Sequence, residues 1–121
     1  MQIVFFLYNE NRSKTMLQQR DVQIVHLFKQ RIQELTTVKR VVVFGSRARG
    51  DATGESDLDV FVELSRLTPH LHRQIMEIAW EISLENDVVI SVFLTSTSLL
   101  NKSPLAGNPI LRVIESEGIS V

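Results

Sequence analysis

Two apolar runs that enclose a polar, glycine-bearing segment restrict the fold more than any other feature of the chain. Residues 39–44 end in four consecutive β-branched or aromatic residues, a composition typical of a strand buried on both faces. Residues 58–64 are again mostly apolar and predict a second strand. Glycine and charged residues fill positions 45–56, so the whole stretch predicts two strands joined by a polar turn region.

Segments with helical periodicity lie on both sides of these strands. A first amphipathic helix of about five turns is predicted by apolar residues that recur at helical spacing, namely Leu17, Ile24, Phe28, Ile32 and Leu35. A second helix is expected to be capped by Thr68 and to begin with Pro69, whose missing N–H would have no partner in the first turn. The predicted buried face of this second helix consists of Leu71, Ile75, Ile78, Ala79 and Ile82.

The rest of the chain predicts a third strand and a short closing helix. The strand is expected over residues 87–94, and the helix is expected to begin at Asn108-Pro109 and to end at Gly118. Short strands that alternate with helices are typical of an α/β or α+β domain. We therefore expect a small mixed β-sheet with helices packed mainly on one face.

Length and composition bound the classes of function. The 121 residues suffice for one domain, predicted over residues 15–121, with residues 1–14 as an N-terminal extension or an extra edge strand. Residues 1–8 are apolar but too short to span a bilayer, and they are of a kind that supports a homodimer contact. The net charge of −1 argues against an extended nucleic-acid surface, and the lack of cysteine excludes disulfides and Cys-based zinc sites.

Asp57 and Asp59 stand at the start of the second predicted strand, where an ordinary core strand would not carry them. Side chains two residues apart in a strand project to the same face, so the two carboxylates point together. They repel each other unless one takes a proton or a cation lies between them, and oxygen ligands of this kind suit Mg²⁺. The alternative is structural, with Asp57 capping a turn and Asp59 facing solvent at a sheet edge.

Gly45 and Ser46 follow the first predicted strand and are suited to a bound phosphate. Glycine accepts unusual backbone angles and close approach, and the serine hydroxyl and nearby N–H groups can donate to phosphate oxygens. The segment lacks the lysine of a Walker loop. Neutralisation of phosphate charge would then fall to a metal and to Arg47 or Arg49.

An apolar strand that ends in Gly-Ser and is followed by Ser-Asp-Leu-Asp-Val at residues 56–60 resembles the signature of minimal nucleotidyltransferases in the DNA polymerase β-like superfamily. The resemblance extends over about residues 17–120. It implies the polymerase β-like nucleotidyltransferase fold, with Gly45 and Ser46 holding a nucleoside triphosphate and Asp57 and Asp59 ligating Mg²⁺. It also implies transfer of a nucleoside monophosphate, with AMP from ATP as the first expectation, to an acceptor hydroxyl. Two Mg²⁺ ions would assist this reaction, and pyrophosphate would leave.

The family carries a third carboxylate on the next strand, and this sequence departs from that pattern. Asp87 stands at the very start of the predicted third strand, whereas aligning the end of the strand puts Ser91 at the expected position. Our hypothesis assigns Asp87 as the third catalytic and metal-binding carboxylate. If Ser91 holds the position instead, the domain is expected to bind Mg-NTP but to transfer slowly or not at all.

The chain offers no predicted acceptor-binding domain, so acceptor recognition is expected to come from a partner. The resemblance implies a helical HEPN-type toxin as that partner, neutralised by adenylylation, in the cytoplasm and without membrane contact. The alternative is a binding module that blocks such a toxin sterically with a vestigial site. Trp80 lies off the apolar stripe of its helix, and the sequence leaves open whether it packs internally or at a protein interface.

Overall fold

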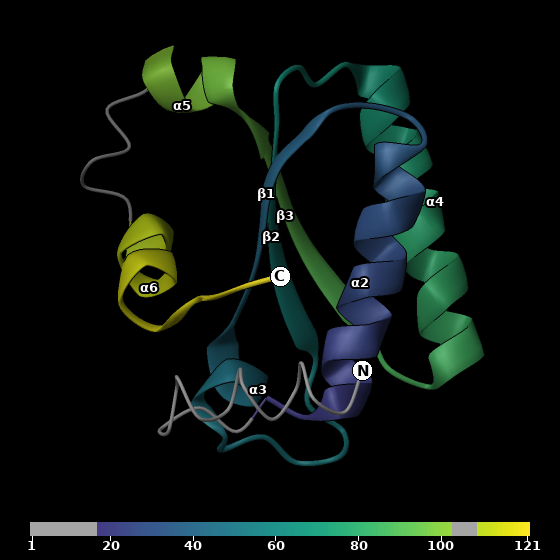
Figure 1. The fold of residues 1–121 in the computed structure, drawn as a ribbon, viewed down its shortest axis with the longest axis vertical. Coiled ribbons are helices and arrows are strands. Elements are labelled where there is room, and N and C mark those ends of the chain that lie inside the picture. The colour runs from purple at the N-terminus through teal and green to yellow at the C-terminus, as the bar shows by residue number, and fades with distance from the viewer. Residues whose placement is uncertain (1–16, 103–108) are drawn as a thin grey trace.

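The computed structural model describes residues 17–102 and 109–121, and these contain a four-stranded mixed sheet in the order β3-β2-β1-β4 (Figure 1). The strands are β1 (Val38–Phe44), β2 (Leu58–Leu64), β3 (Ile90–Ser96) and β4 (Ile119–Ser120). β1 is antiparallel to both β2 and β4, whereas β2 and β3 are parallel. The helices are α2 (Gln19–Gln33), α3 (Gly45–Arg49), α4 (Pro69–Asn86), α5 (Thr97–Lys102) and α6 (Pro109–Glu117).

The sheet is covered on both faces, and the two longest helices, α2 and α4, share one of them (Figure 1). The main core lies between these helices and the sheet, and alternate residues of the central strands, such as Val43 and Val60, are fully buried in it. Val42 and Phe61 point to the other face, where they pack against Ile114 of α6. The expected mixed α/β architecture is therefore confirmed.

The helix α4 begins as its sequence predicts. Thr68 adopts extended backbone angles, its hydroxyl accepts from the N–H of Leu71 at 3.1 Å, and Pro69 occupies the first helical position. The predicted buried face is confirmed, with Leu71 partly buried at its start. In α2 the predicted ends were wrong, because the helix runs only from Gln19 to Gln33. Leu17 is buried just before it, and Leu35 is 42% exposed beyond it.

Two predicted boundaries near the site were also wrong. The segment after β1 is not all turn, because residues 45–49 form the short helix α3. The third strand begins at Ile90, not at residue 87, because α4 continues to Asn86 and Asp87 ends it in the left-handed conformation, at φ 52°. Aspartate is one of the few residues other than glycine that visit this conformation routinely, so Asp87 can terminate the helix.

The C-terminal segment closes the sheet at β1. Gly118 follows α6 and donates to the carbonyl of Ile114 at 3.0 Å, and a Cβ at this glycine would overlap that carbonyl and Val42. The expected stop of the last helix at Gly118 is thus confirmed. Its expected start at Asn108 and the predicted extension over residues 1–14 lie outside the described residues.

Strand direction brings the segments of the predicted site together. Because β1 is antiparallel to β2 and β2 is parallel to β3, the end of β1 and the starts of β2 and β3 meet at one edge of the sheet. Helix α3 and the start of α2 lie at the same edge (Figure 1). Among the helices in the described part of the chain, none is long and apolar enough to cross a membrane.

Candidate active site

Asp59 lies in β2 and Asp57 immediately precedes that strand, and the alternation of side chains along the extended backbone places both carboxylates. Leu58 and Val60 are fully buried toward α2 and α4, so Asp57 and Asp59 project to the opposite face. Asp57 is exposed and Asp59 is partly buried. Burial raises the pKa of the Asp59 carboxyl, the neighbouring charge of Asp57 raises it further, and Arg49 acts in the opposite direction. The pair therefore creates the unfavourable concentration of negative charge that a bound cation would relieve.

Gly45 lies against Asp59, one member of this pair. Its φ of +76° is in the region that disfavours other residues, and a Cβ at this position would overlap Oδ2 of Asp59. Helix α3 begins at Gly45, so Ser46 and the first N–H groups of the helix, which have no intrahelical acceptor, lie in the segment that adjoins Asp59. Backbone donors next to two carboxylates form a surface that suits a metal-bound phosphate group.

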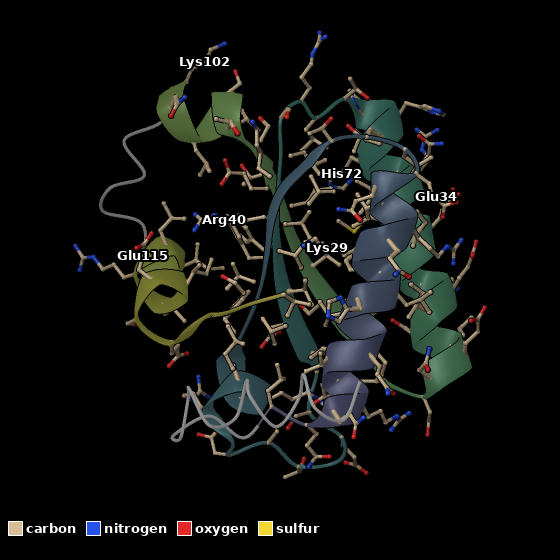
Figure 2. All side chains as sticks on the ribbon, viewed as in Figure 1. Lys29, Glu34, Arg40, His72, Lys102 and Glu115 are labelled. Atoms are coloured by element: carbon tan, nitrogen blue, oxygen red, sulfur yellow. The ribbon has the colours of Figure 1, made fainter. Side chains whose placement is uncertain are left out.

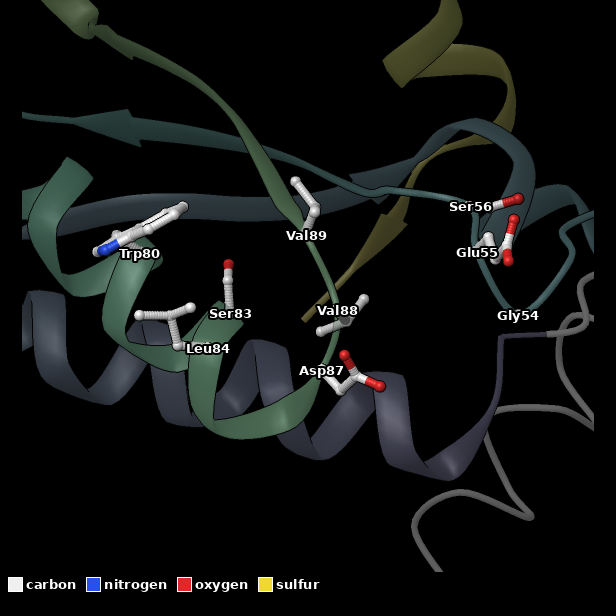
Figure 3. Close-up of a pocket in the computed structure, with 9 residues that line it drawn as sticks. All are labelled: Gly54, Glu55, Ser56, Trp80, Ser83, Leu84, Asp87, Val88 and Val89. Atoms are coloured by element: carbon white, nitrogen blue, oxygen red, sulfur yellow. The ribbon is translucent and has the colours of Figure 1, made fainter.

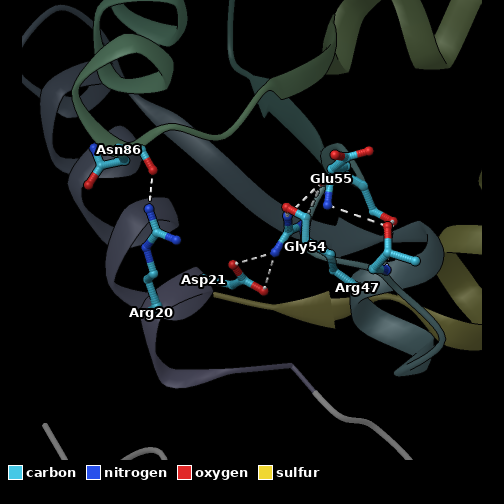
Figure 4. A network of polar contacts seen from close by, with 8 residues as sticks. Arg20, Asp21, Arg47, Gly54, Glu55 and Asn86 are labelled. Carbon is cyan, nitrogen blue, oxygen red and sulfur yellow. Dashed lines mark hydrogen bonds and ion pairs between the residues drawn. The ribbon is translucent and has the colours of Figure 1, made fainter.

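Arg47 makes contacts that sequence analysis did not foresee (Figure 4). Nη1 donates to both carboxylate oxygens of Asp21, at 3.2 and 3.4 Å. Nε and Nη2 donate to the carbonyl of Ser56 at 2.9 and 2.7 Å, and Nη2 also reaches the carbonyl of Gly54 at 3.4 Å. All three nitrogens thus bind protein oxygens, and they fix the loop that ends immediately before Asp57. The nucleotide-binding role assigned to Arg47 stays a prediction.

Asp21, which sequence analysis missed, is a buried partner in this arrangement. Asp21 is 4% exposed and lies in the first turn of α2. A buried carboxylate needs a charged or strongly hydrogen-bonded partner, which Arg47 provides. The signal was available in the sequence, because Asp21 stands three and seven residues before the buried Ile24 and Phe28 and so interrupts the apolar stripe of the helix.

Arg49 is the exposed cation of the site. It donates to Asp51 at 3.2 Å and to Glu117 at 3.0 Å, so it connects α3 to the end of α6. The hydrogen bonds to Asp51 and then to Glu117 raise the pKa of its guanidinium. The positive charge of Arg49 partly offsets the rise that burial and Asp57 cause in the pKa of Asp59. An incoming phosphate group would compete for this side chain with the exposed carboxylate of Asp51 and the partly buried carboxylate of Glu117.

The third carboxylate is where structure and hypothesis differ most. Ser91 lies directly opposite Asp59 in the register of β2 and β3. Asp87 precedes the strand, is exposed, and lines a cavity of about 520 Å³ together with Glu55 and Ser56 (Figure 3). Within the described ranges, no three His, Asp or Glu side chains are grouped closely enough to hold a metal ion. The structure brings Asp57 and Asp59 together and leaves Asp87 outside their group.

Asp57 and Asp59 nevertheless fit a magnesium ion. Mg²⁺ is commonly held by one or two carboxylates while water and substrate phosphates complete its octahedral shell. Burial and then the charge of Asp57 raise the pKa of Asp59, and a bound cation would offset both by stabilising the ionised carboxylates. The donor set thus suits an ion that arrives with a nucleotide better than one held by protein ligands alone.

Two neighbouring carboxylates beside a short helix that begins with glycine, on a mixed sheet, are the arrangement expected of an enzyme that transfers phosphate-containing groups. Residues 25–116 match the nucleotidyltransferase domain family, and the chain belongs to that family. It is 38% identical over 73 residues to the Methanocaldococcus jannaschii protein MJ0141, covering 58% of this chain and 74% of that one. It is 32% identical over 65 residues to MJ0604 of the same organism, covering 54% of this chain and 61% of that one. Both are named as protein adenylyltransferases.

Solved structures agree on the fold. A crystal structure of the toxin–antitoxin pair MntA–HpeT with a tyrosine-to-alanine substitution contains a chain that matches with a TM-score of 0.55 at 19% identity. The match covers 86% of this chain and 72% of that one. A toxin–antitoxin structure with AMP-PNP matches with a TM-score of 0.56 at 18% identity, covering 83% and 70%. At these identities the likeness establishes a shared nucleotidyltransferase fold.

Proposed function

We propose that this protein is a Mg²⁺-dependent adenylyltransferase that moves AMP from ATP to a hydroxyl group on a protein partner. The observation that carries the proposal is the pair of neighbouring carboxylates, Asp57 and Asp59, of which Asp59 packs against Gly45, the glycine that begins α3. Relatives named as protein adenylyltransferases support the choice of AMP and of a protein acceptor. A similarly folded structure with AMP-PNP supports adenine nucleotide as the donor.

Each residue of the site has a role in this proposal. Gly45, Ser46 and Arg49 bind the triphosphate, through backbone N–H groups, a hydroxyl and a guanidinium. Asp57 and Asp59 would hold two Mg²⁺ ions, which would neutralise charge on the phosphates and lower the pKa of the acceptor hydroxyl. The acceptor oxygen forms a bond to the α-phosphorus as the bond to the pyrophosphate oxygen breaks, and the hydroxyl proton passes to Asp57 or to water.

The partner in this proposal is a small helical HEPN-type toxin, and modification by this protein neutralises it in the cytoplasm. Structural similarity to a toxin–antitoxin pair supports such an assignment. A second candidate function is neutralisation by binding alone. One observation favours it: the position opposite Asp59 is occupied by Ser91, which cannot serve as an anionic metal ligand or as a strong base.

The experiment that tests the proposal incubates the protein with Mg²⁺, a HEPN-type protein encoded beside it, and ATP labelled on the α- or the γ-phosphate. Adenylyl transfer puts label on the partner from α-labelled ATP only, whereas kinase activity would require the γ-label. Asp57→Asn should abolish labelling. Glu34→Gln is a matched control, since Glu34 lies at the end of α2 remote from α3 (Figure 2). If Asp57→Asn fully neutralised the toxin while the toxin carried no label, neutralisation by binding alone would be supported.

A further inference from the structure

Three of the most exposed apolar side chains in the described residues lie around one cavity. Trp80, Leu84 and Val89 are 65%, 64% and 58% exposed, and all three line the cavity of about 520 Å³ next to the site (Figure 3). Trp80 and Leu84 are one turn apart on α4, and Val89 leads into β3. We call these three residues the apolar shelf. Grouped exposure of this kind is typical of an interaction site.

The charge around the shelf restricts what can bind there. Glu55 and Asp87 are the charged residues that line the cavity, and no Lys, Arg or His is among its described lining residues. The C-terminal end of α4 adds partial negative charge at the same place. Arg20 donates to the carbonyl of Asn86 from α2 without lining the cavity (Figure 4). An apolar occupant with positive charge is therefore favoured, and a triphosphate is disfavoured.

The shelf is joined to the carboxylate pair through the backbone. Val89 accepts a hydrogen bond from the N–H of Leu58, the residue between the two aspartates, at 2.8 Å. Ser56 lines the same cavity and directly precedes Asp57. A chain that lies on the shelf is thus next to the loop that leads into Asp57 and the strand that carries Asp59, although neither aspartate is among the described lining residues of the cavity.

We propose that the apolar shelf binds a segment of a partner protein that combines large apolar residues with Lys or Arg, and so delivers an acceptor hydroxyl to Asp57 and Asp59. The assignment of the hydroxyl rests on the function proposed above, whereas the binding of the segment does not. Trp80 is the anchor, because tryptophan supplies a large, rigid contact area and often dominates such interfaces. The acidic rim selects the charge of the partner.

Trp80 also provides the readout, because it is the single tryptophan of the chain. A display library of random 12-residue peptides is selected on the full-length protein and, in parallel, on Leu84→Ala. Peptides enriched on the wild type alone should carry net positive charge and large apolar residues, and should shift Trp80 emission to shorter wavelength. Leu84→Ala and Glu55→Lys should each weaken their binding at least tenfold, whereas Leu35→Ala, a second exposed leucine, should not.

Several outcomes would contradict the proposal that the apolar shelf binds a basic, apolar segment of a partner. These are enrichment of acidic peptides, equal enrichment on Leu84→Ala, or no enrichment at all. A shift of Trp80 emission on addition of adenosine would show that the shelf binds a nucleobase instead. A shift of this emission as the protein concentration rises would show that it binds a second copy of the chain. Exposure of Trp80 on removal of residues 1–14 would assign it to the chain itself.

A further variant separates this inference from the proposed function. Asp57→Asn should bind the selected peptides within twofold of the wild type while losing transfer of AMP to them. Binding without transfer by the wild type would contradict the proposed function and leave the shelf intact, whereas transfer that is unaffected by Leu84→Ala would contradict the shelf alone.

Discussion

Ser91 lies directly opposite Asp59 in the parallel pairing of β2 and β3. Since opposite residues in neighbouring strands project to the same face, the serine hydroxyl and the Asp59 carboxylate share the face of the sheet opposite α2 and α4. This is the position from which a side chain on β3 would complete a three-carboxylate site. Asp59 therefore faces an uncharged neighbour on β3, and this bears directly on the rate of any transfer.

Ser91→Asp should increase the rate of AMP transfer by about tenfold or more, because a third carboxylate would add a metal ligand and a base. Without nucleotide the variant should be less stable than the wild type, because a third negative charge joins two that already repel. Initial rates with α-labelled ATP and urea unfolding measure the two effects. Ser98→Asp, on the exposed surface of α5, is the control. An unchanged rate would mean that β3 does not contribute a ligand position.

Asp87→Asn should leave the maximal rate of transfer within about threefold, because Asp87 lies before β3 and apart from the carboxylate pair. Asparagine is the suitable replacement, since it tolerates the φ of 52° that alanine would adopt only with strain. The KM for a basic acceptor should rise, because one charge of the cavity rim is lost. A hundredfold fall in the maximal rate would restore Asp87 as the third catalytic carboxylate.

Asp59→Asn should raise the free energy of unfolding at neutral pH in the absence of nucleotide. The pKa of Asp59 is raised in the folded protein above its ordinary value of 3.8, so ionisation destabilises the fold above the folded pKa. The wild type should gain stability relative to the variant as the pH falls through the raised pKa toward 3.8, and the difference should then vanish. Urea denaturation at pH 7 and pH 3.5 tests this sign.

Mg-ATP should reverse that order. Ligand that binds only the folded state stabilises it in proportion to its affinity, and the variant lacks one of the metal-binding carboxylates. Thermal unfolding with and without Mg-ATP should therefore show a larger upward shift for the wild type than for Asp59→Asn. A variant that is destabilised at pH 7 without ligand would contradict the electrostatic account of the pair.

Gly45→Ala should cost about 1–2 kcal/mol from the left-handed backbone alone, and more from the overlap of the new Cβ with Asp59. Nucleotide binding should be lost even at temperatures where the variant is folded. Gly54→Ala is the matched control, because a Cβ there meets no heavy atom within 4 Å, and its stability should change by less than about 0.5 kcal/mol. Equal behaviour of the two variants in unfolding and in ATP titration would remove Gly45 from the site.

Asp21→Ala should destabilise the protein by about 3 kcal/mol, because it leaves the guanidinium of Arg47 without its buried counter-ion. Arg31→Ala breaks the more exposed pair with Glu81 and should cost less than about 1 kcal/mol. A double-mutant cycle with Arg47→Ala, measured by urea unfolding, gives the coupling between Asp21 and Arg47. Coupling near zero would show that Arg47 is held by the loop carbonyls alone.

The sequence predicted those parts of the molecule that depend on local pattern. The second strand, the cap of α4 and the shared face of Asp57 and Asp59 follow from alternation and from turn chemistry within a few residues. The ion pair of Asp21 and Arg47 joins residues 26 positions apart, so periodicity can flag the misplaced acid but cannot name its partner. The left-handed backbone of Asp87 likewise decides whether that acid lies in the strand, and no local rule required it.

The contacts of Arg47 restrict how the site could be transferred to another protein. The stretch from residue 41 to residue 64 contains Gly45, both aspartates and Arg47, so it looks like a continuous segment that could be transferred to another protein. Its arginine, however, is neutralised by Asp21, which belongs to a different helix and lies outside the segment. If the stretch alone were inserted into another sheet, the partly buried guanidinium of Arg47 would lack its counter-ion. A functional transfer must therefore include a carboxylate on the adjoining helix as well.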